Sequence, residues 1–334
     1  MGQAMIRPAL TTAAIALGLA LNALGSASAG AQDWPTRPVT LVIPFAAGSG
    51  SDIVGRILAP YISELLGRPV IVENVGGAGG ITGVSRVARA APDGYQIVLG
   101  TAGTHSVNQT LYKRLPYSAV ADFVPVALTV EQPIAVIART DLPVHDLQEL
   151  LSYVKANQAR MQYGSPGAGT TPHLACVLLN ALIGANVTHV PYRGAAPAMQ
   201  DLMAGRIDYQ CAAFAPVLPQ IESNLVKAIA LLKGTRSPAL PKLATAHEQG
   251  LTGFEASTWY ALFVPKGTPR AIVQKLNEVT VATMNLPAVQ QRLKEVGTDP
   301  VAPDRLSPEY LQEFVENEIK KWAAAIKTSG VSID

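Results

Sequence analysis

Short apolar runs alternate with longer helical stretches through most of the chain, and this alternation constrains the fold more than any other sequence feature. The apolar runs are typical of buried strands. Strands that alternate with helices predict an α/β fold, with open, mostly parallel sheets flanked by helices. The predicted strands are Val39–Ile43, Val70–Val75, Ile97–Leu99, Ile134–Ala138, Thr188–Pro191, Ile207–Cys211, Val226–Leu231 and Tyr260–Val264. The predicted helices are Ser51–Leu66, Thr82–Ala90, Asp146–Asn157, Thr171–Ile183, Ala195–Ala204, Pro269–Met284, Pro287–Val296 and Ser307–Ser329.

The first 31 residues have the pattern of an export signal. They contain no acidic residue, one basic residue (Arg7), an apolar run from Ala9 to Leu24 and then small residues. This order predicts a signal peptide over residues 1–31, cleaved after Ala29 or, as we favour, Ala31. A membrane anchor is less favoured because the run is short and is broken by polar residues and glycine. We therefore expect export to the periplasm.

Charge and composition exclude several classes of protein. The 26 Lys and Arg residues nearly balance the 24 Asp and Glu residues, so the chain has no charge excess for general nucleic-acid binding. No later stretch is long and apolar enough to span a membrane, so the mature protein is not expected to be membrane-embedded. The histidines and cysteines lack metal-ligand spacing, so no metal site is expected. Cys176 and Cys211 are either a disulfide, which an exported compartment permits, or two buried thiols, the reading we favour.

About 300 residues are too many for one ordinary sheet domain, so the sequence favours two lobes. Chain crossings are predicted near residues 129–133 and 254–260. Lobe 1 would then consist of residues 32–131 plus 257–334, and lobe 2 of residues 132–256. Such an arrangement leaves a cleft with a two-segment hinge.

Two glycine-rich turns are predicted to face each other across this cleft. The first, Phe45–Asp52, follows a strand and opens a helix, and the second, Tyr163–His173, does the same in the other lobe. Glycines allow close approach of a ligand to the backbone, and a helix start offers unpaired N–H groups to an anion. Ser49, Ser51 and Thr170 are among the residues that add hydroxyl donors. For each turn by itself, a plain capped strand-to-helix connection is the structural alternative.

Other residues could line the cleft. Thr101, Thr104 and His105 follow a strand, and Arg193 ends one and could pair with a carboxylate. Trp259 lies at the second crossing, where it could stack on a planar ligand or pack in the hinge. An exported serine hydrolase, using Ser49 or Ser51 with His105 or His173, is a weaker alternative because no G-x-S-x-G sequence is present.

An ordered series of short motifs gives the chain a family resemblance. They include Trp34-Pro35-x-Arg37-Pro38, Pro92-Asp93-Gly94-Tyr95, Val190-Pro191-Tyr192-Arg193-Gly194, Gly205-x-Ile207-Asp208 and Pro265-x-Gly267-Thr268-Pro269. In this order they resemble the Bug family, the periplasmic receptors of tripartite tricarboxylate transporters.

The resemblance implies a two-lobed, type II-like Venus-flytrap binding protein that is not an enzyme and has no cofactor. It implies a monomer that captures a small organic carboxylate (a di-, tri- or aromatic carboxylate) for membrane permease subunits. A ligand-sensing receptor of a signalling system is the alternative. The predicted ligand-binding residues are Phe45, Ala47, Gly48, Ser49, Ser51, Asp52, Thr101, Thr104, His105, Ser165, Gly167, Ala168, Gly169, Thr170, Thr171, Arg193, Asp208 and Trp259.

Overall fold

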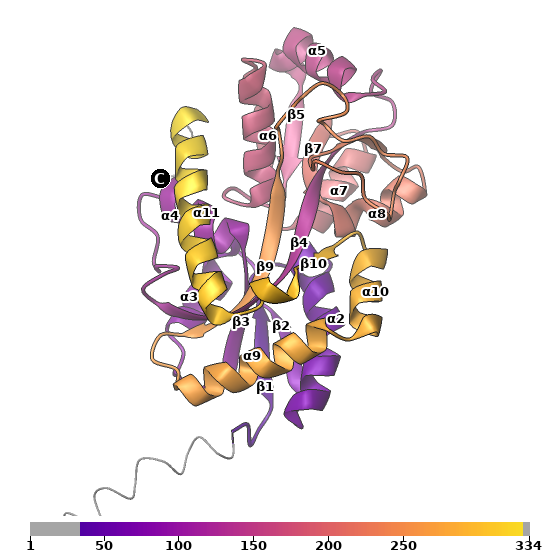
Figure 1. Cartoon of the computed structure of the whole chain (residues 1–334). Helices are drawn as coiled ribbons and strands as arrows, with labels where there is room; N and C mark the ends of the chain where they lie inside the picture. The colour runs from indigo at the N-terminus through magenta and orange to yellow at the C-terminus, as the bar shows by residue number, and fades with distance from the viewer. Residues whose placement is uncertain (1–33, 330–334) are drawn as a thin grey trace, which may run out of the picture. The chain divides into compact units, whose positions relative to one another are not determined.

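A computed structural model describes residues 34–329, and the fold lies in the compact unit that begins at Arg37. The predicted signal peptide, residues 1–31, lies outside the described residues. The α/β prediction is confirmed, with helices on both sides of a continuous sheet (Figure 1).

Within the described residues, the strands form one 10-stranded sheet with β2-β1-β3-β9-β4-β7-β5-β6 as its main order. The strands are β1 (Val39–Ile43), β2 (Val70–Asn74), β3 (Gln96–Thr101), β4 (Phe123–Ala138), β5 (Gln162–Ser165), β6 (Thr188–Pro191), β7 (Tyr209–Ala213), β8 (Lys227–Leu231), β9 (Ser257–Pro265) and β10 (Asp299–Pro300). We call β1–β3, β9, β10 and the first part of β4 the first sheet half. The second sheet half comprises β5–β8 and the last part of β4.

The sheet is mixed rather than mostly parallel. The parallel pairs are β1 with β2 and β3 in the first half, and β5 with β6 and β7 in the second. Both β9 and β4 run antiparallel to the strands beside them. The parallel pairs satisfy the predicted βαβ alternation, and the antiparallel strands join the two halves.

The two halves are connected through β4 and β9, which lie side by side (Figure 1). The part of β4 from Phe123 to Pro133 pairs with β9, and the part from Ile134 to Ala138 pairs with β7 and β8. The change of partner between Pro133 and Ile134 falls at the first predicted crossing. The lobe boundaries themselves stay a prediction.

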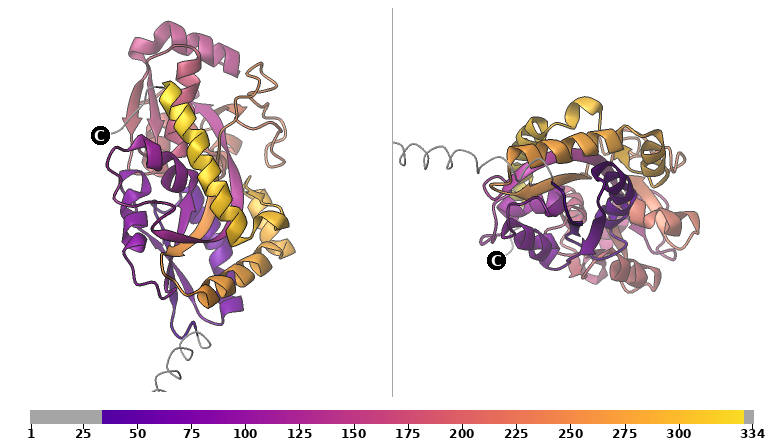
Figure 2. Two further views of the ribbon diagram at one scale, coloured as in Figure 1. Left: turned by 60° about the vertical axis from the view of Figure 1, so that its left-hand side comes forward. Right: turned by 90° about the horizontal axis from the view of Figure 1, so that it is seen from below.

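The helices are α2 (Gly50–Leu66), α3 (Ile81–Ala88), α4 (Asn108–Leu111), α5 (Leu147–Asn157), α6 (Thr171–Leu182), α7 (Ala195–Met203), α8 (Phe214–Glu222), α9 (Arg270–Met284), α10 (Pro287–Glu295) and α11 (Pro308–Ser329). Short turns of helix are η1 (Ala78–Gly80), the π-helical η2 (Gly103–Val107), η3 (Gln158–Arg160) and η4 (Pro303–Arg305). Helix α11, drawn in yellow, crosses β4 (Figure 2). Its Trp322 and Ile326 pack in one apolar cluster with Leu111 of α4 and Leu174 of α6.

Two apolar cores cover the two faces of the second sheet half. Tyr209 and Cys211 of β7 belong to the core that contains α5 and α6, whereas Ala212 belongs to the core that contains Phe214, Val217 and other residues of α7 and α8. Alternate strand residues point to opposite faces, so Gln210 lies on the same face as Ala212. That face borders the candidate site.

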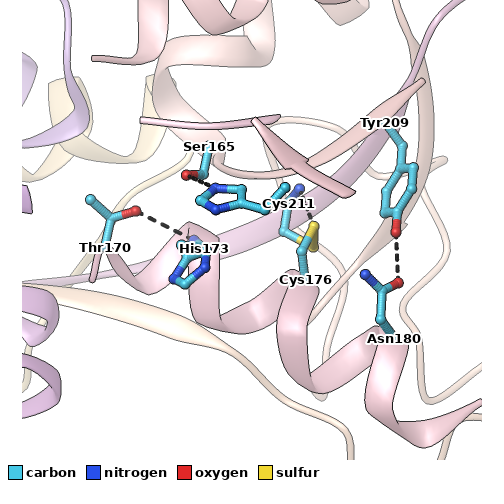
Figure 3. The surroundings of a disulfide bond; sticks show 8 residues. Ser165, Thr170, His173, Cys176, Asn180, Tyr209 and Cys211 are labelled. Atoms are coloured by element: carbon cyan, nitrogen blue, oxygen red, sulfur yellow. Dashed lines mark hydrogen bonds between the residues drawn. A yellow bond between two sulfur atoms is a disulfide. The ribbon is translucent and has the colours of Figure 1, made fainter. Parts of the chain in front are cut away.

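Cys176 of α6 and Cys211 of β7 form a disulfide, with their Cα atoms 5.4 Å apart (Figure 3). Both side chains are fully buried. The prediction that we favoured, two buried free thiols, is therefore wrong, and the disulfide alternative is the one that the structure shows. The bond fixes α6 to the middle of the second sheet half.

Candidate functional site

The turn before α2 is organised by its own polar side chains. Ser49 caps the helix, and its hydroxyl accepts a hydrogen bond of 3.3 Å from the Asp52 amide. The Gly48 amide donates to the Asp52 carboxylate at 2.8 Å, with Gly48 at φ +79°. These two reciprocal hydrogen bonds fix the conformation of the turn at the beginning of the helix. The left-handed backbone conformation at position 48 explains why this residue is glycine.

Asp52 faces the protein rather than the cavity. Its carboxylate also accepts hydrogen bonds from Arg56 at 3.0 Å and from Asn74 at 2.9 Å. Burial by itself would raise the pKa of Asp52, but the bonds from Arg56, Gly48 and Asn74 outweigh it and hold the pKa below its usual value. Asp52 is therefore a charged anchor of the first turn and not a contact for an anion.

The turn before α6 has a different chemistry. Thr170 caps the helix, and its hydroxyl accepts a hydrogen bond of 3.4 Å from the His173 amide (Figure 3). The same hydroxyl donates to the Gly167 carbonyl at 2.8 Å. Thr171 donates to the Thr258 hydroxyl of β9 at 3.4 Å, a contact between the two sheet halves. No acidic residue stands in the first turn of α6. Its N–H groups and partial positive charge are thus not offset by a carboxylate of the same turn.

Both helix starts line one cavity of about 320 Å³. The first sheet half and its loops contribute Phe45, Gly48, Ser49, Gly50, Ser51, Thr101, Thr258 and Tyr260. The second contributes Pro166, Thr170, Thr171, Pro172, Ala195, Ala196, Met199, Gln200, Met203, Gln210, Ala212, Ala213, Pro216, Val217 and Gln220. The central geometric expectation, that the two turns share a hollow, is met.

The wall of this cavity carries hydroxyls and amides but no formal charge. Among the described residues that line it, none is Asp, Glu, Lys, Arg or His. A carboxylate in the cavity would therefore be met by helix N–H groups and hydroxyls. Such neutral donors need no counter-ion when the site is empty.

Tyr260 links the cavity wall to the strand crossing. Its hydroxyl, buried with the ring, donates to Gln132 at 2.7 Å, and the Gln132 amide donates to Thr298 at 2.9 Å. Burial raises the pKa of Tyr260 well above its usual value, so the hydroxyl keeps its proton. A side chain at Gly50 would collide with both the Tyr260 hydroxyl and Gln132, which explains the glycine at the first position of α2.

Seven of the predicted site residues line this cavity: Phe45, Gly48, Ser49, Ser51, Thr101, Thr170 and Thr171. Three others, Gly167, Ala168 and Arg193, line a second hollow of about 220 Å³, which also borders Phe45 and the glycine-rich segment 76–80. Ala47 is exposed and lines neither hollow, and Gly169 packs against Tyr112. The second predicted turn is therefore divided between two hollows.

Asp208 and Trp259 have structural partners away from the cavity. Asp208 accepts from Arg139 at 3.0 Å and from the Gln162 amide at 2.7 Å. Trp259 is buried and its indole N–H donates to Glu318 of α11 at 3.1 Å. The aromatic surface of the cavity thus comes from Phe45 and Tyr260, and the reading of Trp259 as hinge packing is the one its contacts fit.

His105 lies in the core of the first sheet half. It is fully buried, stacks on Phe263 with ring centroids 4.0 Å apart, and shares a hydrogen bond of 2.9 Å with Thr104. Burial lowers the pKa of His105 to about 3, so the ring is neutral. Thr104 in turn accepts from the Thr101 amide at 3.0 Å. This pair shapes the turn after β3 and does not line the cavity.

The serine–histidine pairs considered for a hydrolase, Ser49 or Ser51 with His105 or His173, are not formed among the described residues. The Ser49 hydroxyl bonds to Ser51 at 3.2 Å, and His173 accepts from the Gly169 amide at 3.4 Å. Ser165 is fully buried and shares a hydrogen bond of 2.7 Å with His189 instead. Burial lowers the pKa of His173 to about 3 and that of His189 to about 4. Both rings are therefore neutral, and with Ser165 they pack behind the second turn.

Sequence reasoning missed the part of the cavity formed by α7, β7 and α8. Helix α8 was not predicted, because Pro216 and Pro219 obscure a helical pattern of nine residues. Gln210 stands in a predicted strand, where alternation could have placed it opposite the buried Tyr209 and Cys211. In residues 34–329 the structure has no helix long and apolar enough to cross a membrane, and no His, Cys, Asp and Glu group able to hold a metal ion.

The sequence matches the model of the tripartite tricarboxylate transporter family receptor over residues 54–331. It is 40% identical to the UPF0065 protein in the TAR-I ttuE-ttuC' intergenic region of Agrobacterium vitis, over 90% of this chain and 87% of that protein.

Two solved structures are also similar. The periplasmic binding protein BugD has a TM-score of 0.86 and 40% identity, covering 90% of this chain and 99% of BugD. MatC from Rhodopseudomonas palustris, solved with bound malate, has a TM-score of 0.84 and 37% identity, covering 88% of this chain and all of that one (100%). The fold is thus that of a two-lobed periplasmic binding protein. The chain belongs to the tripartite tricarboxylate transporter receptor family, the Bug-type periplasmic binding receptors, which are not enzymes.

Proposed function

We propose that this protein captures a small organic carboxylate in the cavity between the starts of α2 and α6. The observation that carries the proposal is the shared, uncharged hollow into which both helix starts open. The malate in the related MatC structure supports a carboxylate as the ligand class.

The anion would be held by neutral donors. Helix starts favour anions by about 0.3–1 kcal/mol or more each, and the effect is larger where water is excluded. Ser51 and Thr171 are buried and line the cavity, so their hydroxyls can replace the water that a carboxylate gives up. Because the described wall has no fixed cation, a bound carboxylate would be held by weaker attraction, and the protein could release it again.

Capture would proceed by closure of two lobes, residues 32–131 plus 257–334 and residues 132–256, about crossings near 129–133 and 254–260. The Thr171–Thr258 contact supports this, because it joins the halves beside the cavity. The protein would be exported by its leader, act as a periplasmic monomer and present the ligand to permease subunits in the membrane.

The test is a thermal-shift screen against malate, other di- and tricarboxylates and aromatic acids, followed by calorimetric titration of the hits. Thr171→Val keeps the side-chain shape and removes the hydroxyl, and we expect it to weaken binding about tenfold. Thr188→Val, an exposed position on β6, is the matched control and is expected to bind as the wild type does. If no acid raises the melting temperature, or if both variants bind equally, the proposal is wrong.

A further inference from the structure

Tyr112 connects the two predicted lobes at the second turn. It directly follows α4 in predicted lobe 1, and its hydroxyl donates a hydrogen bond of 3.1 Å to the Ala168 carbonyl in predicted lobe 2. Burial raises the pKa of Tyr112, so the hydroxyl keeps the proton that it donates. Ala168 stands in the chain just before Thr170 and Thr171, which line the cavity, whereas Tyr112 is not among the described residues that line it.

Three glycines allow the two predicted lobes to approach closely around this bond. A side chain at Gly169 would collide with the Tyr112 ring, which lies 2.8 Å from the place of its Cβ atom. A side chain at Gly79, in predicted lobe 1, would collide with the Ala168 carbonyl. The Cβ atom of a side chain at Gly103 would lie only 3.2 Å from the Gly169 carbonyl. Because glycine has no Cβ atom, the second turn can lie directly against η1, η2 and Tyr112.

An apolar cluster continues this contact. Leu111 of α4 and Leu174 of α6 are buried in it together with Trp322 and Ile326 of α11, and Tyr112 packs against the cluster. Apolar packing is non-directional, whereas a hydrogen bond requires a defined distance and angle. The Tyr112 hydroxyl is therefore suited to fix where the second turn lies relative to predicted lobe 1.

The other hydrogen bond between the halves at this turn is less suited to that role. It joins Thr171 to Thr258 and is longer, at 3.4 Å, and both residues line the cavity. A carboxylate that binds the Thr171 hydroxyl would compete with this bond. The bond from Tyr112 lies outside the cavity lining and can persist while a ligand is bound.

We propose, on the basis of the proposed function, that Tyr112 is a positioning residue for carboxylate binding. Its bond to Ala168 holds Thr170 and Thr171 at the cavity when the two lobes are closed around the ligand. Opening of the lobes separates Tyr112 from Ala168 and breaks the bond. The bond therefore stabilises the closed, liganded form over the open form, and it slows release of the ligand.

The experiment uses Tyr112→Phe, which keeps the ring and removes the hydroxyl. Calorimetric titration and stopped-flow kinetics are carried out with the best acid from the thermal-shift screen. The variant is expected to bind this acid about fivefold more weakly, because one hydrogen bond of the closed form is lost. The loss should lie in a faster dissociation, with the association rate within about twofold of the wild type. The melting temperature without ligand should not change, because the open form lacks the bond.

Tyr117→Phe is the matched control. The Tyr117 hydroxyl is buried and donates to the Thr104 carbonyl at 2.6 Å, and both residues belong to predicted lobe 1. Loss of this bond should lower the melting temperature without ligand and leave acid affinity within about twofold of the wild type. It thus shows what a purely structural tyrosine hydroxyl does.

Two results would overturn the inference while the proposed function stands. In one, Tyr112→Phe binds and releases the acid as the wild type does. In the other, Tyr112→Phe behaves like Tyr117→Phe, with a lowered melting temperature without ligand and an unchanged dissociation rate. A wild type that binds no acid would refute both the inference and the proposed function.

Discussion

The two helix starts that share the cavity are built in different ways. The start of α2 carries Asp52 in its first turn, tied to Arg56 and Asn74, whereas the start of α6 has no acidic residue in its first turn. A carboxylate in the first turn offsets the positive end of a helix. If an anion binds here as proposed, α6 would supply most of the attraction for it, and α2 would supply hydroxyls and shape.

The two starts are also anchored differently. Hydrogen bonds of the Asp52 carboxylate hold the first, and a disulfide one turn along the helix, together with neutral buried histidines, holds the second. A charged side chain that anchored the α6 start would change the electrostatic potential where the ligand is proposed to bind. The disulfide and the neutral histidines fix the helix without changing that potential.

Removal of the disulfide is expected to have the largest effect. Cys176 and Cys211 are 35 residues apart, and closing a loop of that length stabilises a protein by about 3–4 kcal/mol. The double variant Cys176→Ala, Cys211→Ala should lose about that much free energy of unfolding in urea. Hydrogen exchange should rise more at the start of α6 than at the start of α2. A urea midpoint equal to that of the wild type would contradict this.

A carboxylate added to the α6 start is the next test. Thr171→Asp places a negative charge beside the anion, and repulsion at close range should weaken acid binding about 100-fold, or about 2.7 kcal/mol. Asp is favourable in the first turn of a helix, although position 171 is buried, so the melting temperature of the variant is measured first to check that it folds. Titration with the best acid from the screen measures the change, and Thr188→Asp serves as the control. Equal losses in the two variants would mean that α6 does not hold the anion.

Neutralising the α2 anchor should affect stability rather than affinity. Asp52→Asn is expected to cost about 1–2 kcal/mol of unfolding free energy. Because the folded pKa of Asp52 is lowered, its contribution is present above pH 3.8, the ordinary value, and is lost as the pH falls below it. The difference between wild type and variant should therefore shrink below pH 3.8. A large loss of acid affinity in Asp52→Asn would instead make Asp52 part of the ligand contact.

The buried histidines predict a pH dependence of the folding stability, which builds up gradually as the pH falls. His105, with a pKa lowered from 6.5 to about 3, stays neutral when folded, while the unfolded chain takes up a proton below pH 6.5. Stability is thus lost as the pH falls from 6.5 towards 3, by about 1.4 kcal/mol per pH unit for one histidine. His105→Phe should reduce the slope by that amount, and Thr188→Val, at an exposed position without a titrating group, should leave it unchanged. Urea titrations between pH 4 and 6.5 measure both.

The sequence predicted the α/β class, most strands and the shared hollow, because apolar runs, capping residues and glycine turns are local signals. Ser49 and Thr170 illustrate this, since each caps the helix that its turn was expected to open. The sequence-based site was least accurate for residues whose role depends on long-range packing. His105, Asp208 and Trp259 follow or stand in strands near the cleft, yet their partners Phe263, Arg139 and Glu318 are far away in the chain.

The α7–β7–α8 wall could not be predicted from local patterns. Met199, Gln210 and Val217 come together only because β7 lies beside β5 and is covered by α7 and α8 on one face. The antiparallel pairing of β4 with β7 and β9 could not be predicted either. A run of buried residues predicts a strand but does not show the direction of the neighbouring strands.

Hydrogen bonds connect Tyr260 of the cavity wall to Gln132 of β4 and then to Thr298. Tyr260 touches the space that a guest molecule would fill, and Gln132 sits one residue before the position where β4 changes partners. A chain of three hydrogen-bonded side chains therefore runs from the cavity wall to the strand crossing. If a ligand shifts the Tyr260 hydroxyl, a reporter group near Thr298 is expected to register the change without occupying the cavity.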